Sequence, residues 1–209
     1  MQNKGNELIT IAQRIRAMSQ TALVYSTNDY EIERSHEMIT LSDRIVSIVS
    51  GIDDNIIHAD YHPAKEYVTP KIDIRAVIFN AKDEILLVKE KADGKWALPG
   101  GWADVGFTPK EVIIKETKEE TGFCVHVVRL LAVFDKRCHN HPASPFYIYK
   151  LCFLCEITGG DGELTYDILD KGFFALDRLP PLSIDRILPE QIALLDRLRR
   201  ESGSNIYCD

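Results

Sequence analysis

WALPGGWADVGFTPKEVIIKETKEETGF, residues 96–123, is the stretch that decides the fold of the C-terminal part of this chain. It predicts a short strand, a Gly-Gly turn and a helix in direct succession. Thr108 and Glu111 form a capping box with proline at the first helical position, and Gly122 suits the C-terminal cap. We therefore predict a helix over residues 109–121, in which Glu111 serves the cap.

Three further glutamates of this helix are the candidates for a functional site. At about 100° per residue, Glu119 and Glu120 lie within about 60° of Glu116, so the three carboxylates share one face. One interpretation is a solvated face stabilised by i to i+4 pairs through Lys115. The other is a cation site, because the carbonyls of the turn at residues 99–101 add hard oxygen ligands suited to Mg²⁺ or Mn²⁺. The adjoining turn favours the cation site.

The composition limits the class of protein. The chain has 209 residues, 45% of them hydrophobic, which is enough to bury a core, and a net charge of −7 argues against broad adhesion to nucleic acid or anionic membrane. The polar start and the lack of a long apolar window predict a cytoplasmic protein without a membrane span. Five scattered cysteines fit reduced thiols. A three-residue offset on a strand points Cys152 and Cys155 to opposite faces, which makes zinc there an unattractive hypothesis.

The apolar pattern changes along the chain. Residues 6–50 carry apolar positions at helical spacing and predict two or three helices, and residues 58–70 resemble a linker. Strand patterns begin at Lys71, and a closing amphipathic helix is predicted over residues 189–200. We predict a helical N-terminal domain over residues 1–64, and an α+β domain over residues 65–209.

A resemblance follows from these residues. The segment from Gly101 is similar to the Nudix box, G-x5-E-x7-R-E-U-x-E-E-x-G-U, where U is an aliphatic residue. It matches at Glu116, Glu119, Glu120 and Gly122. It departs at Phe107, Lys115 and Thr117, where the family has glutamate, arginine and an aliphatic residue. Lysine keeps the charge of arginine and loses its bidentate fork.

The resemblance covers most of the chain and extends to a two-domain Nudix subgroup that includes CDP-choline pyrophosphatases. It implies an α/β/α sandwich with a mixed sheet, preceded by a small all-α domain that forms a homodimer. It implies hydrolysis of the pyrophosphate bond of a nucleoside diphosphate linked to a group X, with CDP-choline favoured and ADP-ribose second. The implied catalytic residues are Glu116, Glu119 and Glu120. The same glutamates, the Gly100 carbonyl and Asp167 would bind Mg²⁺ or Mn²⁺, with Asp170 and Glu163 as alternatives to Asp167.

Substrate contacts are predicted from charged positions around this motif. The loop DKRCHNHPAS carries two cations and two imidazoles that suit a phosphate or a base, although a polar hairpin connection explains it equally well. Arg75 either points into the pocket or belongs to an edge strand, and Asp104 is a turn residue or a substrate contact. The predicted substrate-binding set is Arg75, Asp104, Lys136, Arg137 and His141. Two other hypotheses remain, an RNA 3′-end exonuclease of the same fold and a nucleotide-binding regulator without catalysis.

Overall fold

The computed structural model describes residues 2–60, 69–142, 147–160, 168–201 and 205–209. The chain divides into two compact units, each described here by itself. One comprises Met1–Val68 with Asp104–Gly106, and the other comprises Thr69–Ala103 with Phe107–Asp209. The predicted domain boundary between residues 64 and 65 lies outside the described residues and stays a prediction.

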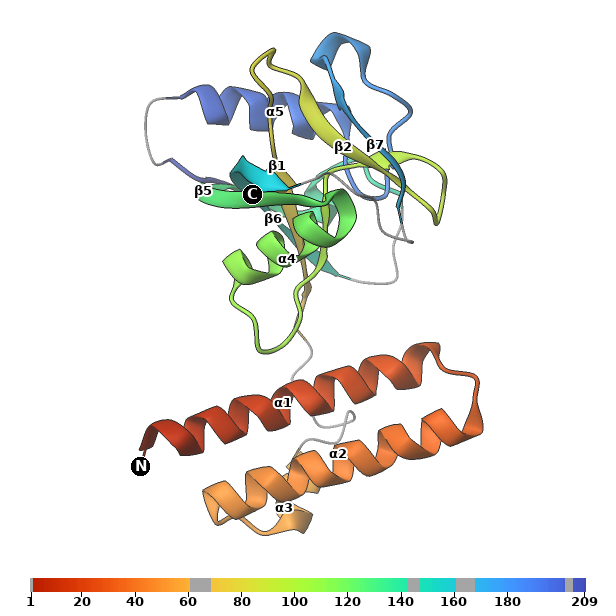
Figure 1. Ribbon diagram of the computed structural model, residues 1–209, viewed down its shortest axis with the longest axis vertical. Helices are drawn as coiled ribbons and strands as arrows, with labels where there is room; N and C mark the ends of the chain where they lie inside the picture. Colours follow the sequence, from red (N-terminus) through yellow and green to blue (C-terminus); the bar gives the residue numbers. More distant parts are fainter. Residues whose placement is uncertain (1, 61–68, 143–146, 161–167, 202–204) are drawn as a thin grey trace. The chain divides into compact units, whose positions relative to one another are not determined.

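The described part of the N-terminal unit contains three helices, in agreement with the two or three that the apolar spacing predicted (Figure 1). They are α1 (Gln2–Tyr25), α2 (Asp29–Ser50) and α3 (Asp54–Asp60). Asn28 caps α2 by accepting hydrogen bonds from the amides of Tyr30 and Glu31, and Gly51 ends it in the left-handed conformation. None of the described helices combines the length and the apolar character that crossing a membrane requires.

The core of this unit is small and partly polar. Its buried apolar cluster consists of Ala12, Val46 and Ile57, and a buried ion pair joins Arg16 of α1 to Asp43 of α2. Ile9 and Ile45 pack half-buried against this cluster, whereas other large apolar side chains of the two long helices stay exposed, among them Leu8, Ile11, Met18, Met38, Leu41 and Ile48. The helices therefore bring mainly small and polar residues together, and part of their apolar surface remains exposed.

The described residues of the second unit form two sheets, and both sheets contribute residues to each of two buried clusters. The larger sheet has the order β4-β1-β6-β5-β8, and the smaller has the order β3-β2-β7. Strand β1 runs parallel to β6, and β5 runs parallel to β8, whereas the other pairs are antiparallel, so the larger sheet is mixed as predicted. The strands are β1 (Lys71–Val77), β2 (Ile85–Glu90), β3 (Trp96–Ala97), β4 (Gly100–Trp102), β5 (Phe123–Asp135), β6 (Ile148–Gly160), β7 (Ile168–Phe174) and β8 (Tyr207–Cys208).

Two helices cover opposite sides of these strands. Figure 1 shows α4 (Pro109–Thr121) and α5 (Pro189–Arg200) on either side of β5 and β6. Val112 and Ile113 of α4 belong to one buried cluster, and the apolar face of α5 belongs to another. This arrangement is the predicted α/β/α sandwich, and it places α4 directly after the turn that begins β4.

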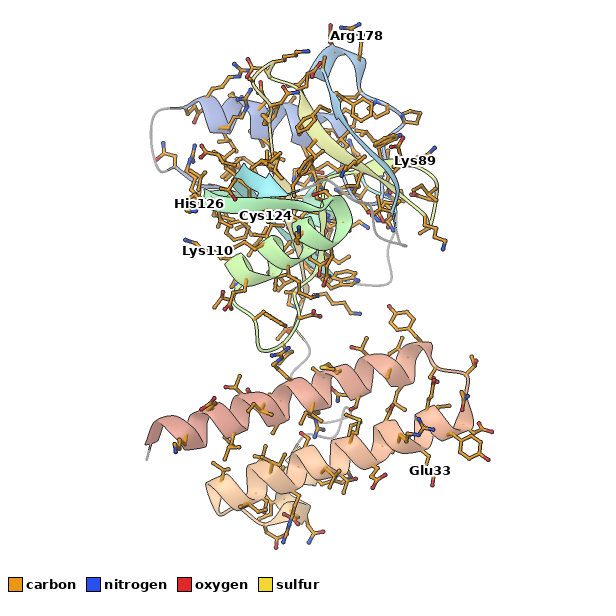
Figure 2. All side chains as sticks on the ribbon, viewed as in Figure 1. Glu33, Lys89, Lys110, Cys124, His126 and Arg178 are labelled. Carbon is orange, nitrogen blue, oxygen red and sulfur yellow. The ribbon has the colours of Figure 1, made fainter. Side chains whose placement is uncertain are left out.

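The long strand β5 serves both clusters because its pairing with β6 is bulged. At its start, Cys124 and His126 are exposed, whereas Val125 and Val127 are buried against α4 (Figure 2). Register shifts follow, after which buried residues of β5 face the α5 side. On β6, Cys152 and Cys155 lie in different clusters, as their offset predicted, and burial raises the pKa of both thiols to about 12.

Candidate active site

The strand, turn and helix at residues 96–123 form as the sequence predicts. Thr108 Oγ1 accepts the amide of Glu111, the Glu111 side chain accepts the amide of Thr108, and Gly122 closes α4 with φ of 70°. Gly100 has φ of +133°, and a Cβ there would lie 2.0 Å from the carbonyl oxygen of Ile74. Only glycine lets β4 approach β1 this closely, which is why the turn needs glycine at this position.

Glu120 is the most enclosed of the three candidate carboxylates. Its Oε2 accepts a hydrogen bond of 2.7 Å from the amide of Gly100, which ties the last turn of α4 to the start of β4. Burial raises the pKa of Glu120 to about 8, with Glu90 and Glu116 adding to the rise, while the charge of Arg75 and the Gly100 amide oppose it. The site therefore disfavours the carboxylate unless a cation joins it.

Glu116 lies beside the same turn, and the metal-binding role of Glu119 stays a prediction. A Cβ at Gly101 would lie 3.1 Å from Oε2 of Glu116, so this carboxylate rests against the glycine backbone. Lys115 Nζ lies 3.1 Å from Glu116 and 3.4 Å from Glu119, whose side chain is 54% exposed. The lysine thus holds one enclosed and one exposed carboxylate, and the predicted i to i+4 pair with Glu119 is confirmed.

Phe107, the residue that stands where the family motif has its first glutamate, is part of the packing. Its side chain is half-buried against the cluster beneath α4, and Lys115 Nζ lies 6.0 Å from the centre of its ring. A cation near an aromatic face is weakly attracted by the ring. The ring therefore packs against the buried residues of α4 and attracts the ammonium group of Lys115, which contacts Glu116.

The carboxylates and the glycine turn fit an open divalent-cation site. Within the described part of the chain, no group of three or more His, Cys, Asp or Glu side chains could by itself hold a metal ion. Mg²⁺ commonly takes only one or two protein carboxylates and completes its shell with water and substrate phosphates. Glu120 against Gly100 and Glu116 against Gly101 supply such a partial set of hard oxygen donors, and the raised pKa of Glu120 agrees with a buried acid whose charge is not fully compensated.

Arg75 is held by the protein itself. It lies on β1 between β4 and β6, so the interpretation as an edge-strand arginine is wrong. Its side chain is 8% exposed; Nε donates to Asp73 over 2.9 Å and a terminal nitrogen donates to the carbonyl of Leu98 over 2.9 Å. Nearby negative charge, including that of Glu120, raises the pKa of Arg75 against the effect of burial. Direct contact with substrate stays a prediction.

The loop after β5 is more structured than its polar composition suggests. Lys136 begins the short 3₁₀ helix η1 (Lys136–Cys138), and its buried ammonium pairs with Asp185 over 2.6 Å. His141 Nδ1 lies 2.6 Å from the carbonyl oxygen of Ile184, and burial lowers the pKa of His141. Arg137 is exposed and stacks 5.3 Å above the ring of Tyr147. Substrate binding by these residues stays a prediction.

The positions of Asp167 and Asp104 relative to the carboxylates are not given by the described structure. Asp167 lies outside the described part of the chain, as does its alternative Glu163, while Asp170 lies on β7 opposite Lys89. Asp104 is exposed and belongs to the compact unit of the N-terminal helices. The roles proposed for Asp104 and Asp167 remain predictions.

The sequence analysis missed a set of buried charges next to the turn. Asp73 is 5% exposed and Lys150 2% exposed, and the two side chains form an ion pair between β1 and β6. Glu90 lies 3.8 Å from Arg75 and 3.2 Å from Arg186. The sequence KIDIRAV, residues 71–77, contains a signal for these buried charges. Its apolar and charged residues alternate, which puts Asp73 and Arg75 on the same face of a strand whose other face is apolar.

Comparisons with known proteins agree with this geometry. Residues 69–194 match the NUDIX domain, and residues 6–59 match the UDP-X-like, N-terminal oligomerisation domain. YjhB of Bacillus subtilis, provisionally named an ADP-ribose pyrophosphatase, is 41% identical over 94% of each chain. An ADP-ribose pyrophosphatase of Methanocaldococcus jannaschii is 32% identical over 66% of this chain and 78% of its own.

Solved structures give the same result. A UDP-X diphosphatase superposes over 98% of this chain and 99% of its own, with 34% identity and a TM-score of 0.66. An ADP-ribose pyrophosphatase from Streptococcus suis covers 68% of this chain and all of its own, with 41% identity and a TM-score of 0.62. The chain therefore belongs to the Nudix hydrolases, in the two-domain subgroup with an N-terminal helical domain. As the sequence predicted, it is a Nudix pyrophosphatase.

Proposed function

We propose that this protein hydrolyses the pyrophosphate bond of a nucleoside diphosphate linked to a second group X. The observation that carries the proposal is Glu120, an enclosed carboxylate fixed on the Gly100 amide beside Glu116. These two acids, with the Gly100 carbonyl and Asp167 as further ligands, would hold Mg²⁺ or Mn²⁺. When bound, the cation would neutralise pyrophosphate oxygens and lower the pKa of a water molecule.

The chain's own residues would do the remaining work of positioning. The Gly100 amide orients Glu120 toward the turn, and Lys115 orients Glu116 while it also binds the exposed Glu119. Phosphoryl transfer needs little covalent chemistry from the protein, so fixed geometry and charge provide most of the acceleration. Arg137 is the exposed cation of the predicted substrate loop and is free of the buried pairing that engages Lys136 with Asp185.

Two conjugates lead the list of substrates. CDP-choline, which would give CMP and phosphocholine, is suggested by the two-domain subgroup. ADP-ribose is suggested by the names of relatives that share 41% of their residues with this chain. UDP-linked compounds join them because a solved structure that covers 98% of this chain is that of a UDP-X diphosphatase.

The deciding experiment is a panel of conjugates with product identification. Purified protein is incubated with CDP-choline, ADP-ribose and a UDP-sugar in Mg²⁺ and in Mn²⁺, and the products are separated and identified. Metal-dependent release of a nucleoside monophosphate from any member supports the proposed reaction and names the substrate. Nucleotide binding without turnover of any member would refute it in favour of a regulator, and shortening of a single-stranded RNA alone would favour the exonuclease.

We also propose that the N-terminal helices form a homodimer. The exposed stripe on α1, which includes Leu8, Ile11 and Met18, has no cover within its own unit, whose apolar core has only three fully buried members among the described residues. The match of residues 6–59 to an oligomerisation domain supports a second copy as the partner.

A further inference from the structure

A buried chain of charges lies next to the candidate site and belongs to no part of the Nudix motif. Lys150 of β6 pairs with Asp73 of β1, and Asp73 Oδ1 accepts the Nε hydrogen of Arg75 over 2.9 Å. The relative exposures of Lys150, Asp73 and Arg75 are 2%, 5% and 7%. Such burial excludes most contact with solvent, so these groups act mainly on one another and on the backbone around them.

The register of the sheet explains how the chain of charges reaches the turn. Asp73 stands opposite Lys150 on β6, and Arg75 stands opposite Gly100 on β4. From this position Arg75 donates a 2.9 Å hydrogen bond to the carbonyl of Leu98, two residues before Gly100. The next residue, Ala76, donates its amide to the carbonyl of Pro99 over 2.8 Å. The guanidinium therefore braces the backbone that presents the Gly100 carbonyl.

The same turn holds Glu120, because the amide of Gly100 donates a 2.7 Å hydrogen bond to Glu120 Oε2. Arg75 thus contacts the backbone of the turn directly and reaches Glu120 through the Gly100 amide. A fixed orientation of the Arg75 fork is needed for this contact, because the guanidinium is planar and its donors point in set directions.

Stability alone is a poor reason to keep this arrangement. A buried ion pair costs desolvation that its attraction often fails to exceed, and apolar side chains of similar volume commonly stabilise a fold equally well. Fixing a side chain in one orientation is the better-supported use of such groups around a metal site. The low exposure of the three side chains also favours positioning over direct contact with a substrate.

We propose that Asp73 and Lys150 are positioning residues that hold Arg75, and that Arg75 fixes the Leu98–Gly100 turn and Glu120 in the geometry that binds the cation. The inference rests on the proposed function of this site. It adds residues from β1 and β6 to a machinery that the motif confines to the turn and to α4.

The test uses the double variant Asp73→Asn/Lys150→Met, which removes both charges of the ion pair together and leaves Glu90, 3.8 Å from Arg75, as a counter-charge for the guanidinium. The matched control is Asp196→Asn/Arg199→Met, which removes a largely buried ion pair of α5 away from the turn. Thermal unfolding is measured first, then kcat and KM for a conjugate that the wild type hydrolyses, and then Mn²⁺ binding from the electron paramagnetic resonance signal of the free ion.

We expect the double variant to unfold near the wild-type temperature, with kcat and Mn²⁺ affinity each lower by roughly 10-fold or more and KM little changed. The control keeps its kcat and its Mn²⁺ affinity. Wild-type kcat and Mn²⁺ affinity in the folded double variant would overturn the proposal, and a rise in KM alone would overturn it in favour of a substrate contact.

Two further outcomes, an unfolded double variant and an inactive wild type, still allow the proposal to be tested. If the double variant does not fold, Arg75→Lys decides, since lysine keeps the charge but cannot contact Asp73 and the Leu98 carbonyl together; unchanged kcat and Mn²⁺ affinity in that variant would overturn the proposal. If the wild type hydrolyses no conjugate, the proposed function fails. The Mn²⁺ affinities then test the positioning role separately, and equal values in variant and wild type reject it.

Discussion

Replacing Glu120 with glutamine should lower activity and raise metal-free stability in the same protein. The amide oxygen of glutamine can still accept the hydrogen bond from Gly100, so the contact at 2.7 Å is kept while the charge is lost. Without that charge the cation loses an enclosed ligand. We expect kcat to fall by roughly 100-fold or more, which corresponds to about 3 kcal/mol of transition-state stabilisation.

The stability effect follows from the pKa of Glu120. Its ordinary value is 4.5 and burial raises it to about 8, so between these values the folded protein keeps a proton that the unfolded chain releases. The contribution of protonated Glu120 to the free energy of unfolding is therefore fully present below pH 4.5 and is lost as the pH rises through 8. At about 1.4 kcal/mol per pKa unit, the difference corresponds to about 5 kcal/mol as an upper bound, and relaxation of the site reduces it to about 2 kcal/mol.

The assay is urea unfolding in EDTA from pH 5 to pH 9, with kcat measured separately in Mg²⁺ and Mn²⁺. Glu119→Gln is the matched control for stability, because it removes the same charge from a side chain of α4 that is 54% exposed. Glu156→Gln, on the exposed face of β6, is the control for activity. Wild-type kcat in Glu120→Gln would refute the site assignment. A wild-type stability that does not decline relative to the variant above pH 5 would refute the argument from burial.

Three further predictions concern the turn, the lysine and the dimer. Gly100→Ala should lower the free energy of unfolding in urea by about 3 kcal/mol or more, because the added Cβ would collide with backbone. Gly94→Ala is the control: Gly94 also has positive φ but no atom lies within 4 Å of an added Cβ, so this change should cost about 1 kcal/mol. Lys115→Met should lower kcat/KM by roughly 10-fold while Lys115→Arg keeps or raises it, since arginine can contact both carboxylates; equal effects of the two variants would contradict a role for the charge. Met18→Asp should convert a dimer into a monomer in light scattering without unfolding the helices, and a wild-type monomer would contradict the proposed interface.

Local patterns predicted the elements of this fold well. The capping box and Gly122 set the bounds of α4, and the strand pattern predicted from Lys71 onward agrees with β1, which begins at that residue. The two-residue strand β8 was missed, because its formation depends on pairing with β5 and not on any period of its own. The same is true of β4, which the sequence shows only as part of a glycine turn.

The candidate site was predictable only where the motif is contiguous. Glu116 and Glu120 follow from one helix, but the pair Asp73 and Lys150 joins residues 77 positions apart. No local signal gives the register that sets these two strands side by side. For the N-terminal helices, helical spacing predicted the elements but not the side that is buried. The buried residues of α1 are Ala12, Arg16 and Ser19, not the large apolar residues of the predicted stripe.

The acidic face of α4 is compatible with both interpretations that its sequence allows. Glu119 is exposed and pairs with Lys115, as a solvated helix face would. Glu120 is different, because Arg75 and the Gly100 amide together do not bring its pKa back from about 8 to the ordinary value. An enclosed acid that its own protein leaves uncompensated needs another positive charge to remain ionised. Since Glu116 lies against the same turn, a divalent cation bound there would satisfy both carboxylates and would account for like charges at neighbouring positions of the helix.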